Sequence, residues 1–527
     1  MEMKNIYNIP ADKFKFANNA DNLHDKKLET KPVSFFQDAF RRFCKNKGAV
    51  VGAVVISFLI LFSIIGPLFT PFQPAYYDMM FAYATPRNNF FVESGLDFWD
   101  GCKEKNNESY LTYLKDYALG LETNKNVIKG EVVKNEDGTY SYRYDTYYGV
   151  GFDKYKTIPL SEYEDIQRYQ IETGRQVLYP TVALANRPTQ EKNKYDANIY
   201  YVTEDRTQNT IRPKLDENGE IMTNYWKYEA GNLPKLAADY NSIRIEGENG
   251  FVEDGKQYFY AYGRIVDGGI EVRADYYEYY TYYHTQVLKD EVKEPIFYFG
   301  TTSTGKDILA CLAYGARFSF VFALVVAVVN LVVGVIWGSI SGYYGGKIDM
   351  AMERFVEILG AVPTMIVITL LKYHMGTTSQ VIVLFISFFA TGWIGMAGRT
   401  RMQFYRFKNQ EYVLTARTLG ARDRRIMFKH IFPNAIGTLV TSCALIIPSM
   451  IYSETSLSYL GIINLEAGNT TSVGTLIAAG QASITKVGAE YILAFPCVFL
   501  ILLMLSFNLF GNGLRDAFNP SLRGTEE

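Results

Sequence analysis

Long apolar runs alternate with polar stretches along this chain. Residues 48–70 form an uncharged apolar run, residues 316–511 are strongly apolar, and residues 72–298 between them are polar. A membrane span needs about 20 mostly apolar residues. The runs that meet this length predict six transmembrane helices, at 48–70, 318–342, 355–373, 380–398, 435–456 and 491–511. The pattern is therefore typical of an all-α polytopic membrane protein, and it is a poor match to the buried helices of a soluble one.

Two of these runs differ from an ordinary membrane span. The third predicted span is the weakest, because Glu357 lies near its start and Pro363 lies inside it. The first begins after nearly fifty residues, whereas a cleaved signal peptide has a shorter apolar core close to the start. We therefore interpret 48–70 as a retained helix.

Lysine and arginine gather at three places beside the predicted spans. These places precede the first span (31–47), separate the fourth from the fifth (399–429) and follow the sixth (515–523). With six spans all three fall on one side of the membrane, and positively charged flanks mark the cytoplasmic side. Both termini are therefore expected in the cytoplasm and the polar block 72–298 outside the cell. Nucleic acid is not an expected partner, since the basic residues lie next to apolar helices.

The segment before the first span has a pattern of its own. Phe35, Phe36, Phe40 and Phe43 recur at helical spacing within 33–47. This predicts an amphipathic helix on the membrane surface, and a cytoplasmic continuation of the first span is an equally good account. Residues 1–30 have no clear periodicity and predict a loosely ordered tail.

The polar block is rich in tyrosine and acidic. It holds 31 of the 41 tyrosines and 37 acidic against 26 basic residues. Aromatic runs at 139–149 and 257–265 predict strands, turn signals stand at 216–219 and 267–269, and 108–121 and 161–173 predict short helices. We expect a β-rich or mixed α+β domain. Its surface could serve recognition or act only as a structural cover.

Three features that could carry chemistry are weak. The five cysteines are far apart, and the four histidines form no ligand pattern, so no metal site is expected. Residues 300–307, GTTSTGKD, nearly match a phosphate-binding loop, but Asp307 replaces the hydroxyl that would hold magnesium. No strand precedes this loop, and it is expected outside the cell. Asp307 is instead expected to cap the helix that follows.

The segment 411–434, EYVLTARTLGARDRRIMFKHIFPN, is basic and predicts a helix, a turn and a second helix. Val413, Ala416 and Gly420 would share one helical face, where small side chains permit a partner to approach closely. Gly420 is expected to end the first helix, Asp423 to start the next, and Pro433 to end it before the fifth span. The simpler account is a basic loop that only satisfies the charge rule.

This segment resembles the EAA loop of permease subunits in ATP-binding-cassette importers. The residues 414–416 stand where that consensus has E-A-A, and Gly420 and Pro433 match in register. The fuller pattern resembles the C-type permease of the oligopeptide/dipeptide (Opp/Dpp) importers. Similar motifs stand at both ends of the chain, namely RRFCKNKGAVVGAVVI, FGTTSTGKDILACLAYGARFSF, GYYGGKIDMAMER, ETSLSYLG, SVGTLI and LFGNGLRDAFNPSLR. The block at about 75–295 lies outside the resemblance and is expected to be an insertion.

The resemblance implies a type I importer permease in a bacterial plasma membrane that takes up peptides by alternating access. It implies a second homologous permease, two cytoplasmic ATPases that bind ATP and Mg, an extracellular substrate-binding lipoprotein and surrounding lipid as partners. The chain itself would bind no cofactor and catalyse no reaction. The residues implied to contact an ATPase are Glu411, Thr415, Ala416, Gly420, Ala421, Asp423, His430 and Pro433. Glu454, an acid in the fifth span, is expected at a pore mouth or gate, or else to be a locally hydrogen-bonded carboxylate.

The expected organisation is a tail and amphipathic segment (1–47), a first span (48–70), an inserted domain (71–298), a permease core (299–511) with its coupling loop (399–434), and a C-terminal tail (512–527). Two other functions fit parts of this pattern. One is an importer permease for nickel or another solute, and the other is a membrane-anchored receptor or adhesion protein that acts through the tyrosine-rich domain.

Overall fold

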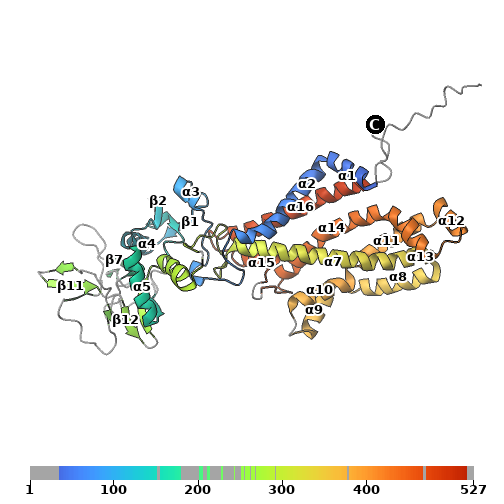
Figure 1. Ribbon diagram of the computed structural model, residues 1–527. Helices are drawn as coiled ribbons and strands as arrows, with labels where there is room; N and C mark the ends of the chain where they lie inside the picture. The colour runs from blue at the N-terminus through green and yellow to red at the C-terminus, as the bar shows by residue number, and fades with distance from the viewer. Residues whose placement is uncertain are drawn as a thin grey trace, which may run out of the picture.

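The computed structural model places a helical bundle at one end and the inserted domain at the other (Figure 1). It describes residues 35–150, 155–179, 269–290, 292–376, 379–466 and 470–518, and seven short strands between 201 and 266. The tail 1–30, the turn predicted at 216–219 and the last nine residues lie outside the described residues.

Five helices in the described part of the chain are long and apolar enough to cross a membrane. They are α2 (Lys47–Ile65, continued by η2, Gly66–Leu68), α7 (Ile308–Tyr344), α10 with α11 (Gln380–Thr391 and Ile394–Phe407), the run from α13 to α14 (Asp423–Arg425, η6 Ile426–Ile431, Phe432–Tyr459) and α16 (Tyr491–Phe518). The shorter apolar helix α15 spans Val473–Ala482.

The third predicted span is broken. Helices α8 (Gly346–Gly360) and α9 (Thr364–His374) meet at an angle of 70°, so the chain has six spans only if this pair counts as one. Pro363 stands at the break, immediately before α9. Its ring disfavours helical backbone in the residue before it and removes a donor, so the helix ends there.

Helix α7 packs closely on α11 through three glycines spaced one helical turn apart. A Cβ atom on Gly338 would lie 2.2 Å from the carbonyl oxygen of Ala397, and one on Gly342 would lie 2.7 Å from that of Arg401. Gly334 is similarly covered by Met396. Small residues let membrane helices approach at backbone distance, where dispersion forces are strongest.

The segment before the first span is a separate helix, α1 (Phe35–Lys45), and does not continue α2 without a break. Asn46 lies between them, and its side chain accepts a hydrogen bond from the backbone N–H of Ala49, which caps α2. The Phe43 ring lies edge-on to Phe510 of α16, at 5.4 Å between centroids. Phe40 is exposed. Helix α1 therefore packs against the bundle on one side only.

The inserted domain is mixed α+β, with antiparallel sheets. Its first sheet has the order β1–β3–β2 (Cys102–Glu108, Tyr140–Asp145, Ile128–Lys134), beside α4 (Tyr110–Thr123). A second has the order β4–β13–β12–β9 (Tyr155–Ile158, Gly269–Ala274, Gly263–Val266, Ser242–Ile243), with β5 (Leu178–Tyr179) also on β13. The rest comprises β6 and β7 (Tyr201–Asp205, Thr210–Pro213), the sheet β10–β11–β8 (Phe251–Glu253, Lys256–Tyr260, Lys227–Glu229) and the helices η3, α3, α5, α6 and η5 (Met79–Phe81, Asn89–Ser94, Leu160–Thr173, Tyr276–Tyr282, Tyr283–Leu288).

Tyrosines form much of the core of this domain. Tyr163, Tyr169, Tyr279 and Tyr282 pack with aliphatic side chains between α5, α6 and the second sheet. The predicted strands at 139–149 and 257–265 and the predicted helices at 108–121 and 161–173 correspond to β3, to β11 with β12, to α4 and to α5. The tyrosine content is thus explained in part by packing.

The insertion is joined to the bundle by two interlocked segments, 70–87 and 297–307, which we call the root. The hydroxyl of Thr70 donates to the Asp307 carboxylate (2.6 Å), and the N–H of Thr301 donates to the carbonyl of Ala84 (2.9 Å). Asp307 also accepts from the N–H groups of Leu309 and Ala310, which confirms it as the cap of α7. The loop 300–307 therefore serves as a connector that starts a membrane helix.

Candidate functional site

The segment 411–434 lies at the end of the bundle away from the insertion (Figure 1). Helix α12 (Glu411–Thr418) is followed by a turn and then by Asp423, the first residue of α13. Val413 is completely buried among Phe404, Ile426 and Ile431. The prediction that Val413 belongs to an open docking face is therefore wrong. Because Val413 anchors α12 to the bundle, the exposed face of that helix is the opposite one.

Gly420 follows α12 in a hydrogen-bonded turn that ends the helix. The N–H of Ala421 donates to the carbonyl of Ala416 (3.1 Å) and that of Gly420 to the carbonyl of Arg417 (3.0 Å), which together are a Schellman motif. Gly420 has φ of +79°, a conformation that favours glycine. No atom lies within 4 Å of a Cβ placed on it. The turn thus leaves open space beside Gly420, next to Leu419, which is 82% exposed.

The second helix does not end at Pro433. It runs without interruption from Asp423 to Tyr459 and becomes the fifth span. The expected break is absent because the turn before the proline, η6, is wound as a wide π-helix. Proline lacks a backbone N–H donor, and its ring crowds the preceding turn. A local change of helical winding makes room for the ring and lets the freed carbonyl find another partner. Helix α13 is consequently continuous with the fifth span.

The remaining predicted residues take different positions. Asp423 accepts a hydrogen bond from the hydroxyl of Tyr343 on α7 (2.6 Å), so the turn is tied to a second span. The Thr415 hydroxyl donates to the carbonyl of Glu411 (2.8 Å), within its own helix. The exposed members of the set are Glu411, Thr415, Gly420, Asp423 and Pro433, and the partly buried ones are Ala416, Ala421 and His430.

A polar cluster beside this segment was missed by sequence reasoning. Arg401 of α11 donates to both carboxylate oxygens of Asp349 on α8 (2.6 and 2.7 Å), and the Tyr405 hydroxyl donates to the same group (2.6 Å). Lys408 donates to the carbonyl of Gly342 (3.0 Å). A paired Arg–carboxylate fork fixes both partners in orientation. The cluster therefore joins α7, α8 and α11 at the end that carries α12.

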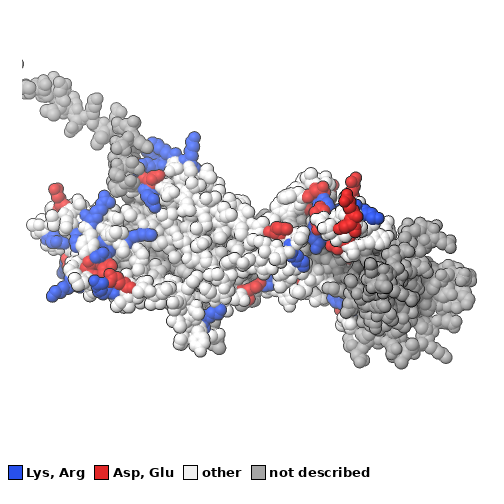
Figure 2. Space-filling view, turned by 180° about the vertical axis from the view of Figure 1, so that it is seen from behind, with Lys and Arg blue, Asp and Glu red and all other residues white. Residues whose placement is uncertain are grey.

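Charge is distributed unevenly over the molecule. On the face that Figure 2 shows, Lys and Arg side chains outnumber Asp and Glu at the end of the bundle that carries α12, the middle of the bundle carries little charge, and Asp and Glu gather where the insertion begins. A shallow hollow beside α13 is lined by Arg422, Arg424, Arg425, Phe428, Lys429 and Pro433. This end thus offers a basic, uneven surface next to the turn at Gly420.

Glu454 is completely buried where α7, α14 and α15 meet. Its carboxylate accepts hydrogen bonds from the hydroxyls of Ser319 (2.9 Å) and Ser458 (3.1 Å). The structure shows that the carboxylate is locally hydrogen-bonded, and a role at a pore mouth or gate stays a prediction. A buried acid that is held in this way stabilises one arrangement of the three helices.

Comparison with known proteins agrees with this geometry. Residues 334–524 match the family described as "Binding-protein-dependent transport system inner membrane component", and residues 34–86 match the "N-terminal TM domain of oligopeptide transport permease C". The "Oligopeptide transport system permease protein OppC" of Bacillus subtilis is 40% identical over 245 residues, which are 46% of this chain and 78% of that protein. The "Dipeptide transport system permease protein DppC" of the same organism is 38% identical over 226 residues, which are 43% of this chain and 69% of that protein.

A solved structure of the MetNI methionine ABC transporter was also found. The match includes 40% of the present chain and 96% of the MetNI chain, with 16% sequence identity and a TM-score of 0.33. That score is too low to support an argument. The sequence matches are stronger: both family matches include helices of the bundle, and most of OppC is covered at 40% identity. The chain therefore belongs to the inner-membrane permeases of binding-protein-dependent transport systems, in the oligopeptide and dipeptide C-type group.

Proposed function

We propose that this chain is one of two permease subunits of a peptide importer, and that two ATPase subunits bind at the end that carries α12. The observation that carries the proposal is the match to OppC over most of its length. The site supports it, because α12 is an exposed helix anchored by Val413 and followed by an open turn at Gly420. A groove on a partner could receive such a helix.

The proposal includes an orientation of the chain in the membrane. The end with α12 would lie in the cytoplasm, because Lys and Arg gather there and favour that side. Both termini would then be cytoplasmic, and the insertion would face the outside, where a substrate-binding lipoprotein would deliver peptide. The insertion, joined through its root to α7, could receive that protein.

The proposed mechanism is alternating access. ATP binding would close the ATPases and shift α12, and release would reverse the shift. Two connections would carry the movement into the membrane: the continuous helix from Asp423 to Tyr459, and the hydrogen bond between Asp423 and Tyr343 of α7. Peptides carry charged ends and backbone polar groups, so their path between the two permeases must hold water. ATP and Mg would be bound by the ATPases only.

Transport by the reconstituted complex tests the proposal. The chain would be placed in proteoliposomes with its second permease, its ATPases and its binding protein, and uptake of a radiolabelled dipeptide, an oligopeptide and nickel would be compared. We expect ATP-dependent uptake of peptide but not of nickel. ATP-dependent nickel uptake without peptide uptake would contradict the assignment, as would peptide binding without any transport.

A further inference from the structure

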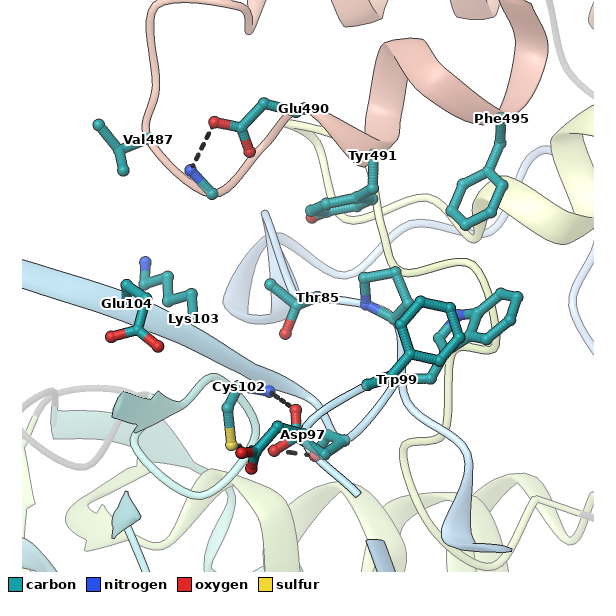
Figure 3. A pocket seen from close by; sticks show the side chains of 14 residues that line it. Thr85, Asp97, Trp99, Cys102, Lys103, Glu104, Val487, Glu490, Tyr491 and Phe495 are labelled. Carbon is teal, nitrogen blue, oxygen red and sulfur yellow. Dashed lines mark hydrogen bonds between the residues drawn. The ribbon is translucent and has the colours of Figure 1, made fainter. Parts of the chain in front are cut away.

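A cavity of about 520 Å³ lies where the insertion meets the bundle. Figure 3 shows its two walls: one is formed by the insertion, with Trp99, Lys103 and Glu104, and the other by the segment leading into α16, with Val487, Glu490 and Tyr491. Small-molecule sites in proteins have volumes of roughly 300–1,000 Å³ and occur preferentially between domains. The cavity is therefore large enough for a short peptide.

The apolar wall of this cavity is rigid. Trp99 stacks on Phe495 of α16 (6.0 Å between centroids) and on Phe299 of the root (6.1 Å). The hydroxyl of Tyr491 donates to the carbonyls of Ala84 (2.9 Å) and Thr301 (3.1 Å), which holds that ring in place. Aromatic rings that are fixed in this way provide contact area at low entropic cost.

Most acidic groups at the cavity already have partners. Asp100 is paired with Arg143 (2.9 Å) and accepts from the N–H of Cys102 (3.0 Å), and Asp97 is also paired with Arg143. Glu490 accepts one hydrogen bond, from the N–H of Gly488 (3.3 Å). Among the described residues its carboxylate has no basic partner, so it retains capacity to accept from a cation.

Lys103 is the basic residue that lines the cavity, and it lacks a polar partner among the described residues. It is half-buried in the cavity wall, and no described residue accepts a hydrogen bond or ion pair from its ammonium group. The nearest aromatic contact is the Tyr144 ring, 5.9 Å from Nζ. Burial lowers the pKa of Lys103, and the positive charges of Lys105 and Lys486 lower it further. An anion placed beside Lys103 would remove this penalty.

We propose that this cavity binds a short zwitterionic peptide with an apolar side chain. Its carboxylate would meet Lys103, its ammonium group would meet Glu490, and its side chain would lie against Trp99 and Phe495. The inference rests on the peptide-permease function proposed above and adds a peptide site at the root of the insertion. The two opposite charges, on the half-buried Lys103 and the exposed Glu490, would select a ligand with both ends free.

Direct binding by the complete transporter in nanodiscs tests the site. The probes are the dipeptide Ala-Phe, its C-terminal amide, its N-acetyl form and free phenylalanine. We expect Lys103→Met to weaken Ala-Phe binding about tenfold or more, since a hydrogen bond to a charged group is lost. Lys103→Arg should retain binding, and Lys134→Met, on an exposed part of the same domain, should have no effect. The Lys103→Met variant should no longer distinguish Ala-Phe from its amide, and Glu490→Gln should no longer distinguish it from the N-acetyl form.

Two results would overturn the proposal. One is equal affinity for Ala-Phe in wild type, Lys103→Met and Glu490→Gln. The other is free phenylalanine binding as tightly as Ala-Phe, which would assign the cavity to amino acids. Location is checked with a dipeptide carrying benzoylphenylalanine, whose crosslinks should map to 97–104 or 487–495; crosslinks only elsewhere would also refute the site. If wild type imports peptides and both Lys103→Met and Glu490→Gln bind Ala-Phe as wild type does, the cavity proposal is refuted while the proposed function stands. If wild type imports no peptide, the proposed function fails first.

Discussion

The open turn at Gly420 leads to a sharp prediction. An asparagine there tolerates positive φ better than most residues, whereas an alanine does not. The left-handed conformation costs a residue with a Cβ about 1–2 kcal/mol, and Gly420 has no neighbour within 4 Å that a side chain would strike. Against a typical stability of about 5–15 kcal/mol, Gly420→Asn should leave the chain folded. If the space beside Gly420 receives an ATPase, the same change should abolish transport.

The assay is ATP-driven peptide uptake in proteoliposomes, with co-purification of the ATPases measured in parallel. Gly461 provides a matched control, because it has φ of +69° and also has nothing within 4 Å of its Cβ, but it follows the far end of α14. We expect Gly420→Asn to lose uptake and ATPase binding and Gly461→Asn to retain both. Wild-type uptake by Gly420→Asn would refute a close contact at this turn and would leave Gly420 only the role of ending a helix.

Three further predictions concern stability, measured by thermal unfolding of the purified chain. Gly338→Val should cost about 3 kcal/mol because a backbone oxygen of α11 blocks the new side chain, whereas Gly395→Val, in open space, should change stability little; equal effects would contradict the close packing. Arg401→Met should cost about 2 kcal/mol by leaving the Asp349 carboxylate without its fork, and adding Asp349→Leu should recover most of the loss; no recovery would contradict the pairing. Burial raises the pKa of Asp307 from 3.8 to about 6, so the stability from its bound proton is present below about pH 4 and is lost as the pH rises through about 6. As the pH rises from about 4 to 7, Asp307→Asn should therefore lose less stability than wild type, and equal losses would show that this carboxylate is not responsible.

Sequence alone located the spans well, because a membrane requires long uncharged runs. The weak third span was identifiable from Pro363, but the 70° bend was not, since the angle depends on what packs on each half. Pro433 led to the opposite error, because a helix end was predicted there and the helix continues through it. A proline signals a helix end only when the preceding turn is an ordinary α-turn, and the π-turn at 426–431 has no clear sequence signature.

The candidate site shows the same division. Val413 and Ala416 share a helical face in any projection, but periodicity cannot tell whether that face meets the bundle or a partner. Burial of Val413 settles this for the chain itself. The Arg401–Asp349 pair was hidden because its two members are 52 residues apart, and Arg401 appeared to be one more charge of the positive flank. The cavity at Lys103 was equally invisible, since its walls come from segments almost 400 residues apart.

Helix α7 has a mechanical consequence. Its 37 residues give a length of about 55 Å, well beyond the hydrocarbon thickness of about 30 Å. One end is fixed in the root by Asp307 and the other is bonded to Asp423 beside α12. The helix therefore links the root of the insertion to the turn beside α12 in one continuous element. If the insertion lies outside the cell, as proposed, an antibody fragment that clamps it onto a neighbouring subunit should stall the ATPase cycle; an unchanged ATPase rate would contradict this connection.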